Sequence, residues 1–143
     1  CMSASNGWQR YGKIPLSMRE LVQVPTSEWV VTEKLHGANF SVFCEAGVIS
    51  FAKRSGLLPP REDFYSFRSQ RLDVELAACA QTLSAQLGAS CVCIYGELVG
   101  GRYPHADVCP IPGLQPVQHG VWYSPSLLFV AFDLLHITPA EGT

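Results

Sequence analysis

The chain has 143 residues, of which 48% are hydrophobic and 15% charged, and this fits one globular domain with little room for a second. The formal charge of −2 is unusual for a nucleic-acid binder, but nine of the ten Lys and Arg residues lie within residues 1–71, beside six Asp and Glu. A local phosphate-binding surface is compatible with this asymmetry, although a solvated basic face is the commoner explanation. Apolar runs such as residues 127–131 are far shorter than the roughly 20 residues of a membrane span, which excludes a transmembrane role.

The region between residues 28 and 54 is predicted to hold three short strands. Residues 28–34 are rich in Trp, Val and Thr, residues 39–45 alternate apolar and polar side chains, and residues 48–54 follow a turn at 45–47. The last two strands are expected to form a hairpin. Gly37 is expected to supply backbone freedom at a bend between the first two strands.

The second half of the chain is predicted to hold one helix and two further strands. After the sheet break at residues 57–60, apolar residues recur at three- and four-residue spacing up to a stop at Gly88; they are Leu72, Leu76, Ala80, Leu83 and Leu87. Residues 91–99 and 127–135 are predicted strands, the second apolar enough for burial on both faces. The connection 102–126 holds five prolines and is expected to be a long ordered loop. Strands interleaved with one helix predict an α+β fold.

The six cysteines include no C-x-x-C pair, so free, buried thiols are the expected state. A zinc site can be drawn from Cys91, Cys93, His105 and Cys109, but its spacing matches no structural zinc pattern, and the sequence argues against it. The amino end has no apolar core of the signal-peptide type. An intracellular, reducing setting is therefore expected.

Lys34 is the first residue that points to chemistry. It lies at the end of a predicted strand, just before the bend at Gly37, where its amine can meet a ligand close to the backbone. A lysine is a nucleophile only when deprotonated, and partial burial or the neighbouring cations Lys53 and Arg54 would lower its pKa. His36, inside the bend, suits phosphate binding or an orienting hydrogen bond. Because K-x-x-G is short and common, Lys34 alone does not distinguish a nucleophile from an ordinary exposed lysine.

Four segments taken together are more specific. Lys34 with Asn39, the sequence Phe-Ala-Lys-Arg-Ser-Gly at 51–56, Ile-Tyr-Gly-Glu-Leu-Val-Gly at 94–100 and Leu-Phe-Val-Ala-Phe-Asp at 128–133 follow one another in the order and spacing of the motifs of covalent ligases. This pattern resembles the Rnl2-like RNA ligases, the family of the bacteriophage T4 RNA ligase 2 and the kinetoplastid RNA-editing ligases. The likeness runs from about residue 11 to residue 135.

The resemblance implies an adenylation domain of the nucleotidyltransferase, ATP-grasp-like type, with largely antiparallel sheets and a flanking helix. By similarity, Lys34 is the nucleophile that attacks the α-phosphate of ATP, releases pyrophosphate and holds AMP in a phosphoramide bond. Asn39 and Arg54 match positions that contact the ribose and the phosphate. Glu33 and Leu35 match positions beside the bound nucleotide, with Glu33 at the adenine edge.

Two further residues are implied in nucleotide binding. Glu97 matches a glutamate that binds the ribose hydroxyls or places the metal, and strand alternation puts it on the same face as Tyr95. Phe132 matches the aromatic that stacks on adenine, with Asp133 expected on the opposite face of the strand. Ile14 is expected to cover the other face of adenine. The ordinary alternatives are a solvated glutamate for Glu97 and core packing for Phe132.

The resemblance stops early, because only eleven residues follow Phe132. The second metal-binding glutamate and the Lys-x-Lys pair that the family has further along are not found. The expectation is a single partial adenylyltransferase domain over residues 1–143, incomplete at the carboxyl end and complemented by a missing segment or a protein partner. The absent lysines would help to neutralise the triphosphate, so the sequence leaves open whether this chain is active by itself.

The predicted function is that of an ATP-dependent RNA ligase that seals RNA with 3′-hydroxyl and 5′-phosphate ends through a lysyl-AMP intermediate, with Mg²⁺ bridging the phosphates. One alternative is a DNA ligase or a GTP-using capping enzyme, which share the lysine motif. Another is a non-catalytic module that only binds nucleotide or RNA, which the missing motifs suggest. Covalent modification of Lys34 distinguishes the enzymes from the binding module.

Overall fold

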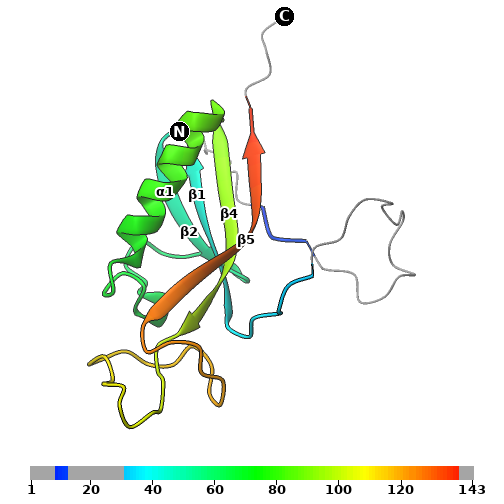
Figure 1. Ribbon diagram of the computed structural model, residues 1–143. Helices are drawn as coiled ribbons and strands as arrows, with labels where there is room; N and C mark the ends of the chain where they lie inside the picture. Colours follow the sequence, from blue (N-terminus) through cyan, green and yellow to red (C-terminus); the bar gives the residue numbers. More distant parts are fainter. Residues whose placement is uncertain (1–8, 13–30, 139–143) are drawn as a thin grey trace, which may run out of the picture.

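The computed structural model describes residues 9–12 and 31–138, which form an antiparallel sheet with one long helix on one face (Figure 1). The strands of the described sheet lie in the order β3-β2-β1-β4-β5. The elements are β1 (Ala38–Glu45), β2 (Val48–Lys53), β3 (Gly56–Leu57), the 3₁₀ helix η2 (Phe64–Ser66), α1 (Leu72–Leu87), β4 (Cys91–Gly100) and β5 (Leu127–Ile137). This arrangement confirms the predicted α+β class.

The hairpin and the helix form where the sequence predicts them. β1 and β2 pair antiparallel up to Glu45 and Val48, across a two-residue turn in which Ala46 and Gly47 have φ of 48° and 79°. α1 ends at Gly88, whose φ of 58° is the left-handed conformation that terminates helices. Within the described residues, no helix combines the length and the apolar character needed to cross a membrane.

The first predicted strand is not observed in the part that the structure describes. Residues 31–36 have neither helix nor strand structure, and residues 28–30 lie outside the described residues. β1 already has β2 at one edge and β4 at the other, so the segment before it has no free edge of β1 to pair with. Lys34 therefore lies in a connecting segment rather than at a strand end.

Gly37 is required at the bend for a different reason from the one expected. Its φ is not in the positive range, but a Cβ placed on it would lie 2.0 Å from the carbonyl oxygen of Leu98 and 2.7 Å from the Val99 side chain. Glycine is needed because β4 passes too close for any side chain, and not because the backbone is left-handed.

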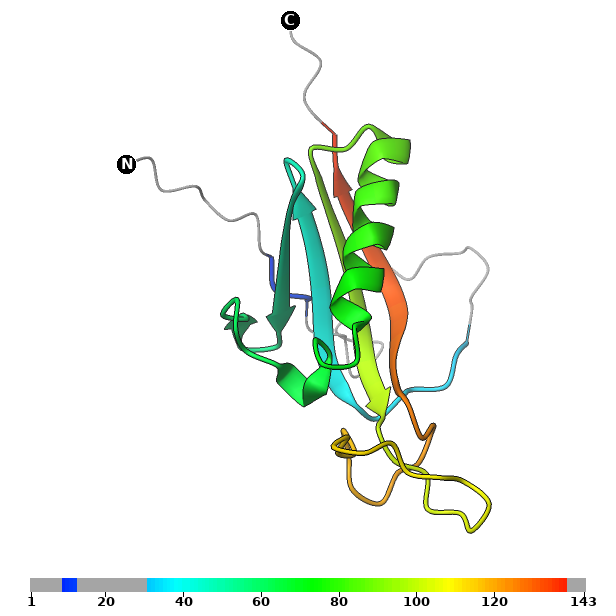
Figure 2. The same ribbon diagram turned by 90° about the vertical axis from the view of Figure 1, so that its left-hand side faces the viewer.

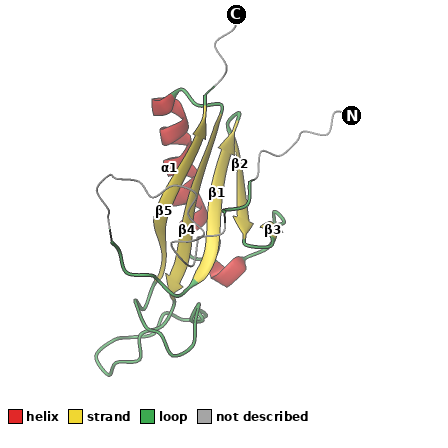
Figure 3. Ribbon diagram, turned by 90° about the vertical axis from the view of Figure 1, so that its right-hand side faces the viewer, coloured by secondary structure: helices red, strands yellow, loops and turns green. Residues whose placement is uncertain are grey.

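The main core lies between the sheet and α1. Figure 2 shows α1 across this face, and Figure 3 shows the opposite face without a covering helix. Phe40 stands at the centre of the core, with its ring 5.8 Å from that of Phe51 and 5.0 Å from that of Phe67. The other buried members include Val42, Leu76, Ala80, Val92, Ile94 and Leu98. A surface groove between α1 and β2 also lies on this side, and it contains none of the predicted site residues.

A smaller cluster of buried residues lies on the face opposite α1. It consists of Phe43, Ala52, Cys93 and Tyr95, with Tyr11, Leu57 and Leu135 packed against it. Alternation along β1, β2 and β4 assigns these residues to the face that α1 leaves open. By the same alternation, Asn39 and Glu97 lie on this open face.

The prediction that β5 is buried on both faces is wrong. β5 is the outermost strand of the described sheet, and most of its large apolar side chains are exposed: Leu128, Val130, Phe132, Leu134 and Ile137. The apolar composition of the segment indicated burial, but α1 lies over the inner strands and leaves most of this outer strand uncovered (Figure 1).

Candidate active site

Several of the predicted site residues come together at one end of the open face. Asn39 on β1 and Glu97 on β4 stand directly opposite each other in the strand register, and both are half-buried. The segment 31–37 enters β1 beside the loop that follows β4, as Figure 3 shows. Arg54 is exposed and comes directly after β2, which pairs with the other edge of β1. Three separate parts of the chain thus bring their polar side chains to this end of the sheet.

The carboxylate of Glu97 is the electrostatic centre of the site. Its Oε1 accepts a hydrogen bond from the backbone amide of Gly37 at 3.1 Å. Burial raises the pKa of Glu97, while this hydrogen bond and the charges of His36, Lys34 and Arg54 act to lower it. The three basic side chains therefore act on the same carboxylate. An arrangement of cations around one acid suits a ligand with several negative charges, such as a nucleoside triphosphate.

Lys34 itself is exposed, and so is Glu33 before it. The side chain of Leu35, which follows Lys34, is half-buried. The charges of Lys34 and Arg54 both act on Glu97, as described above. Glu33 and Leu35 flank Lys34 along the chain, and their assignment to a nucleotide site stays a prediction.

Lys53 does not belong to the site, which corrects the expectation that it would act on Lys34. Its Nζ lies 2.6 Å from Oε1 of Glu62 and 5.4 Å from the centre of the Phe64 ring. Strand alternation explains this, because Lys53 pairs with Phe40 and so shares its face, under α1. Of the two adjacent basic residues, only Arg54 reaches the site.

The loop between β4 and β5 contributes two side chains that sequence reasoning missed. The carbonyl oxygen of Gly37 accepts a hydrogen bond from Nε2 of Gln118 at 2.7 Å. The amide of His36 donates to the hydroxyl of Tyr123 at 3.0 Å. Both contacts join residues more than 80 positions apart, so no local pattern in the sequence marks them.

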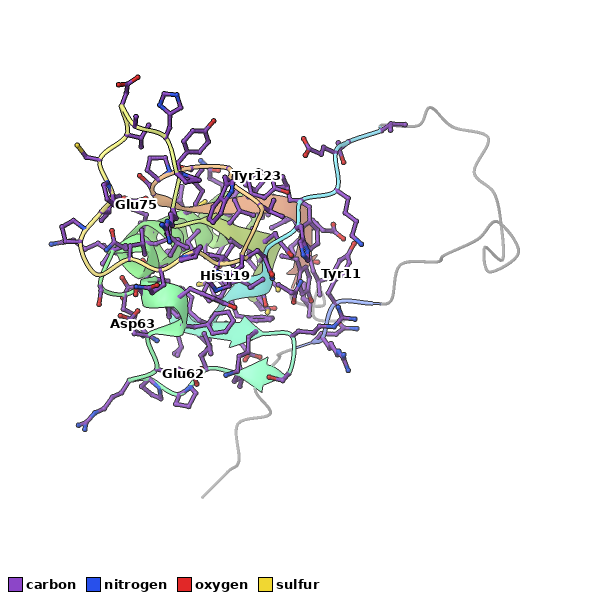
Figure 4. All side chains as sticks on the ribbon, turned by 90° about the horizontal axis from the view of Figure 1, so that it is seen from below. Tyr11, Glu62, Asp63, Glu75, His119 and Tyr123 are labelled. Carbon is purple, nitrogen blue, oxygen red and sulfur yellow. The ribbon has the colours of Figure 1, made fainter. Side chains whose placement is uncertain are left out.

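Tyr11 is a second omission, and it lies beside the predicted adenine-stacking residue. Its ring centre is 5.1 Å from that of Phe132 in an edge-on arrangement and 5.0 Å from that of Tyr95. Figure 4 shows Tyr11 on the side of the sheet away from α1. The hydroxyl of Tyr95 donates to the carbonyl oxygen of Gln9 at 2.8 Å, which holds this amino-terminal segment on the open face. Ile14 lies outside the described residues.

Asp133 is on the same side as Phe132, contrary to the expected alternation. Tyr95 pairs with Asp133 and Gly96 with Ala131, so Phe132 is an extra residue in β5, a β-bulge. As a result both side chains face Tyr11. Phe132 meets its ring edge-on, while burial first and then the neighbouring Asp133 raise the pKa of Tyr11.

Three of the described thiols, those of Cys44, Cys91 and Cys93, are buried as expected, whereas Cys79 and Cys109 are exposed. Burial raises the pKa of Cys93 to about 12 and also raises that of Cys91, which keeps both protonated. Cys109 and His105, the other members of the zinc set considered above, are exposed on the loop after β4. Among the described residues, no group of three or more His, Cys, Asp or Glu side chains is arranged to hold a metal ion.

Comparison with known proteins identifies the family. The model of the family described as RNA ligase matches residues 27–143. The chain is 35% identical over 135 residues to a mitochondrial RNA-editing ligase 2 of Trypanosoma brucei brucei, a match that covers 80% of this chain and 32% of that protein. It is 33% identical over 132 residues to the mitochondrial RNA-editing ligase 1 of the same organism, covering 75% and 28%.

A viral protein also matches. The chain is 29% identical over 107 residues to the protein Early 65 kDa of Autographa californica nuclear polyhedrosis virus, of which it covers 18%. The chain thus spans about a third or less of the length of these relatives. The family match itself extends over most of the chain and includes Lys34, Asn39, Arg54, Glu97 and Phe132. The motifs and the matches agree: the chain belongs to the RNA ligase family.

Proposed function

We propose that this chain is the adenylation part of an ATP-dependent RNA ligase, with a domain of the nucleotidyltransferase type. The observation that carries the proposal is geometric: the half-buried carboxylate of Glu97 accepts the Gly37 amide at 3.1 Å and stands opposite Asn39, which brings the segment that carries Lys34 to this end of the sheet. Lys34 and Arg54 act on that carboxylate, in a chain of the RNA ligase family. Their two positive charges suit a ligand with phosphate groups.

The first chemical step is the transfer of AMP to Lys34. The ammonium group of the exposed Lys34 gives up its proton to water, and the neutral Nζ then attacks the α-phosphorus of ATP. An N–P bond forms, the bond from that phosphorus to the bridging oxygen breaks, and pyrophosphate leaves with the electron pair. Arg54 offsets the negative charge on the phosphate oxygens, because a guanidinium forms directed hydrogen bonds to phosphate.

Two further steps complete the sealing of RNA. An oxygen of the RNA 5′-phosphate attacks the adenylate phosphorus, which breaks the N–P bond and frees Lys34. The 3′-hydroxyl of the other end then attacks the activated 5′-phosphate and releases AMP. The names of the two trypanosome relatives, RNA-editing ligases, support RNA as the substrate.

The remaining predicted residues surround the nucleoside. Asn39 and Glu97, which face each other across β1 and β4, are suited to hydrogen bonds with the ribose. Phe132 is 50% exposed and offers its ring to adenine. We assign Glu33 to the adenine edge, Leu35 to a position beside the nucleotide, and Ile14 to the face of the base opposite Phe132.

Of the described residues, Glu97 is the one that we propose as a ligand for Mg²⁺. Glu97 offers one carboxylate, one oxygen of which already accepts the Gly37 amide, and the described residues contain no larger acidic group for a metal. Phosphate oxygens of ATP and water would complete its coordination. When bound, the ion neutralises charge on the phosphates and so favours the release of pyrophosphate.

The test is covalent labelling of Lys34. The chain is incubated with Mg²⁺ and ATP labelled at the α-phosphate, and the product is analysed by denaturing electrophoresis and intact mass. We expect an AMP adduct that is lost in Lys34→Ala and retained in the matched control Lys53→Ala, since Lys53 lies on the other face of the sheet.

The same test is made with a chimera, because the chain spans about a third of its relatives. In the chimera the chain replaces the matched region of the trypanosome RNA-editing ligase 2, which supplies the rest of a ligase. If neither protein forms an adduct but ATP binds reversibly, the proposal is wrong and the chain is a nucleotide-binding module. Labelling by GTP in preference to ATP would assign the chain to the capping type.

A further inference from the structure

We infer that Gln118 and Tyr123 are positioning residues that hold the backbone of the Lys34 segment in place for the attack on ATP. This inference rests on the proposed function of Lys34. Neither residue is proposed to touch the nucleotide. They act through the bend at His36 and Gly37, which follows Lys34 directly along the chain.

The bend is held by three side chains from distant parts of the chain. The Gly37 amide donates to Glu97 at 3.1 Å, the Gly37 carbonyl accepts from Gln118 at 2.7 Å, and the His36 amide donates to Tyr123 at 3.0 Å. Three backbone groups of the two adjacent residues His36 and Gly37 are therefore satisfied by side chains rather than by strand pairing. Regular backbone pairing resumes at Ala38, where β1 begins.

These contacts matter because the Lys34 segment has no secondary structure to hold it. Residues 31–36 form neither helix nor strand, and Lys34 is exposed. In-line attack needs the amine at a defined position relative to phosphorus, and a displacement of about 1 Å costs on the order of a hundredfold in rate. Contacts that fix the bend therefore limit where the amine of Lys34 can lie.

The loop that supplies both side chains is itself well packed. Leu114 is 8% and Val117 4% exposed, and both belong to the main core. The Val117 amide donates to the carbonyl of Gly100 at 3.0 Å, and the Gly101 amide donates to the carbonyl of Ser126 at 3.1 Å, so the loop is tied to the end of β4. Gln118 follows the buried Val117 directly. A supporting shell of this kind is what pre-organises a reactive group.

The experiment uses three variants and two matched controls. Tyr123→Phe removes one hydroxyl, Gln118→Ala removes the donor, and Gln118→Glu keeps the length of the side chain but removes the donor at neutral pH. Tyr103→Phe and Gln115→Ala make the same chemical changes at exposed positions of the same loop. For all five variants, the rate of Lys34-AMP formation is measured at varied ATP concentration. The variants are made in the chain itself or in the chimera, whichever forms the AMP adduct.

We expect the three variants to lower the maximal rate of adduct formation by about tenfold or more, with the KM for ATP within about twofold of the wild-type value. The two controls should behave as wild type. A second readout is independent of activity: amide hydrogen exchange at His36 should quicken in Tyr123→Phe, while the core amides of β1 and β4 keep their protection.

The outcomes separate this inference from the proposed function. Suppose that wild type is labelled on Lys34. The positioning role is then overturned, and the proposed function stands, if the variants keep the wild-type rate, if they raise only the KM for ATP, or if their amides lose protection from exchange throughout the sheet. If wild type itself is never labelled on Lys34, the proposed function fails and the positioning role for attack fails with it. Unchanged exchange at His36 in Tyr123→Phe would also overturn the positioning role.

Discussion

The carboxylate of Glu97 on β4 accepts the amide hydrogen of Gly37, 60 residues earlier in the chain, at 3.1 Å. This bond places an acid that burial makes harder to ionise beside the segment that carries Lys34. The same carboxylate is half-buried, faces Asn39 and is acted on by three basic side chains. Stability and chemistry therefore both depend on its charge.

The first prediction concerns the pH dependence of stability. The pKa of Glu97 in the folded chain is raised above its ordinary value of 4.5, mainly by burial, so ionisation of this carboxyl destabilises the folded state. The contribution of Glu97 to the free energy of unfolding therefore falls as the pH rises from 4.5 through its pKa in the folded chain. Glu97→Gln removes the cost, and its oxygen still accepts the Gly37 amide. We expect its Tm to exceed that of wild type at neutral pH.

The gain in Tm should disappear below pH 4.5, where the wild-type carboxyl is protonated in both states. The same variant should lose adenylation on the order of a hundredfold, since a charged group at the site is gone. Thermal melts at several pH values test the first part. A gain in Tm that stays constant with pH would contradict the assignment of the effect to ionisation of Glu97.

The second prediction is a severe effect of Gly37→Ala. The new Cβ would lie 2.0 Å from the carbonyl oxygen of Leu98, so the bend or β4 has to move. We expect a loss of about 1–3 kcal/mol in the free energy of unfolding, measured by denaturant titration, together with loss of adduct formation. Gly12→Ala is the matched control, because a Cβ there meets nothing within 4 Å. Equal stability of the two variants would show that the close approach is relaxed in solution.

A third prediction separates nucleotide binding from packing at β5. Phe132 is 50% and Leu134 41% exposed, so alanine at either position should change the Tm little. Loss of the stacking ring in Phe132→Ala is expected to raise the KM for ATP about tenfold. Leu134 pairs with Ile94 and so faces the α1 side of the sheet. Leu134→Ala should therefore leave the KM for ATP unchanged. Equal KM values in the two variants would assign Phe132 to packing.

The fourth prediction contrasts two adjacent basic residues. Arg54→Ala should lower adduct formation by on the order of a hundredfold or more, because it removes a fixed positive charge from the phosphate site. Lys53→Met should leave the rate unchanged and cost less than about 1 kcal/mol of stability, since its ion pair with Glu62 is partly exposed on the α1 side. Labelling rates and denaturant titrations of both variants make the comparison.

Much of the fold follows from local sequence patterns. Alternation and the Ala46-Gly47 turn predict the β1–β2 hairpin, and apolar spacing with a terminal Gly88 predicts α1. Alternation along β4 predicts that Glu97 shares a face with Tyr95, and the strand register confirms it. These predictions succeed because each depends on neighbours within one element.

The failures depend on what lies elsewhere in the fold. The burial of β5 depends on what covers it, which its own apolar composition does not specify. The bulge at Phe132 adds one residue to a strand, and simple alternation then assigns Asp133 to the wrong face. The contacts of Gln118 and Tyr123 with the bend join residues 81 and 87 positions apart, beyond the reach of any periodicity.

The order of pairing in the sheet also has a consequence for how the protein is made. β1 lies between β2, its immediate neighbour in sequence, and β4, which follows only after α1. The hairpin of β1 and β2 can form as soon as both strands leave the ribosome, but the Gly37–Glu97 bond needs a 60-residue loop to close. During synthesis, the segment that carries Lys34 and the Glu97 carboxylate therefore meet only after the helix and β4 have emerged, so the nascent chain completes its candidate site late.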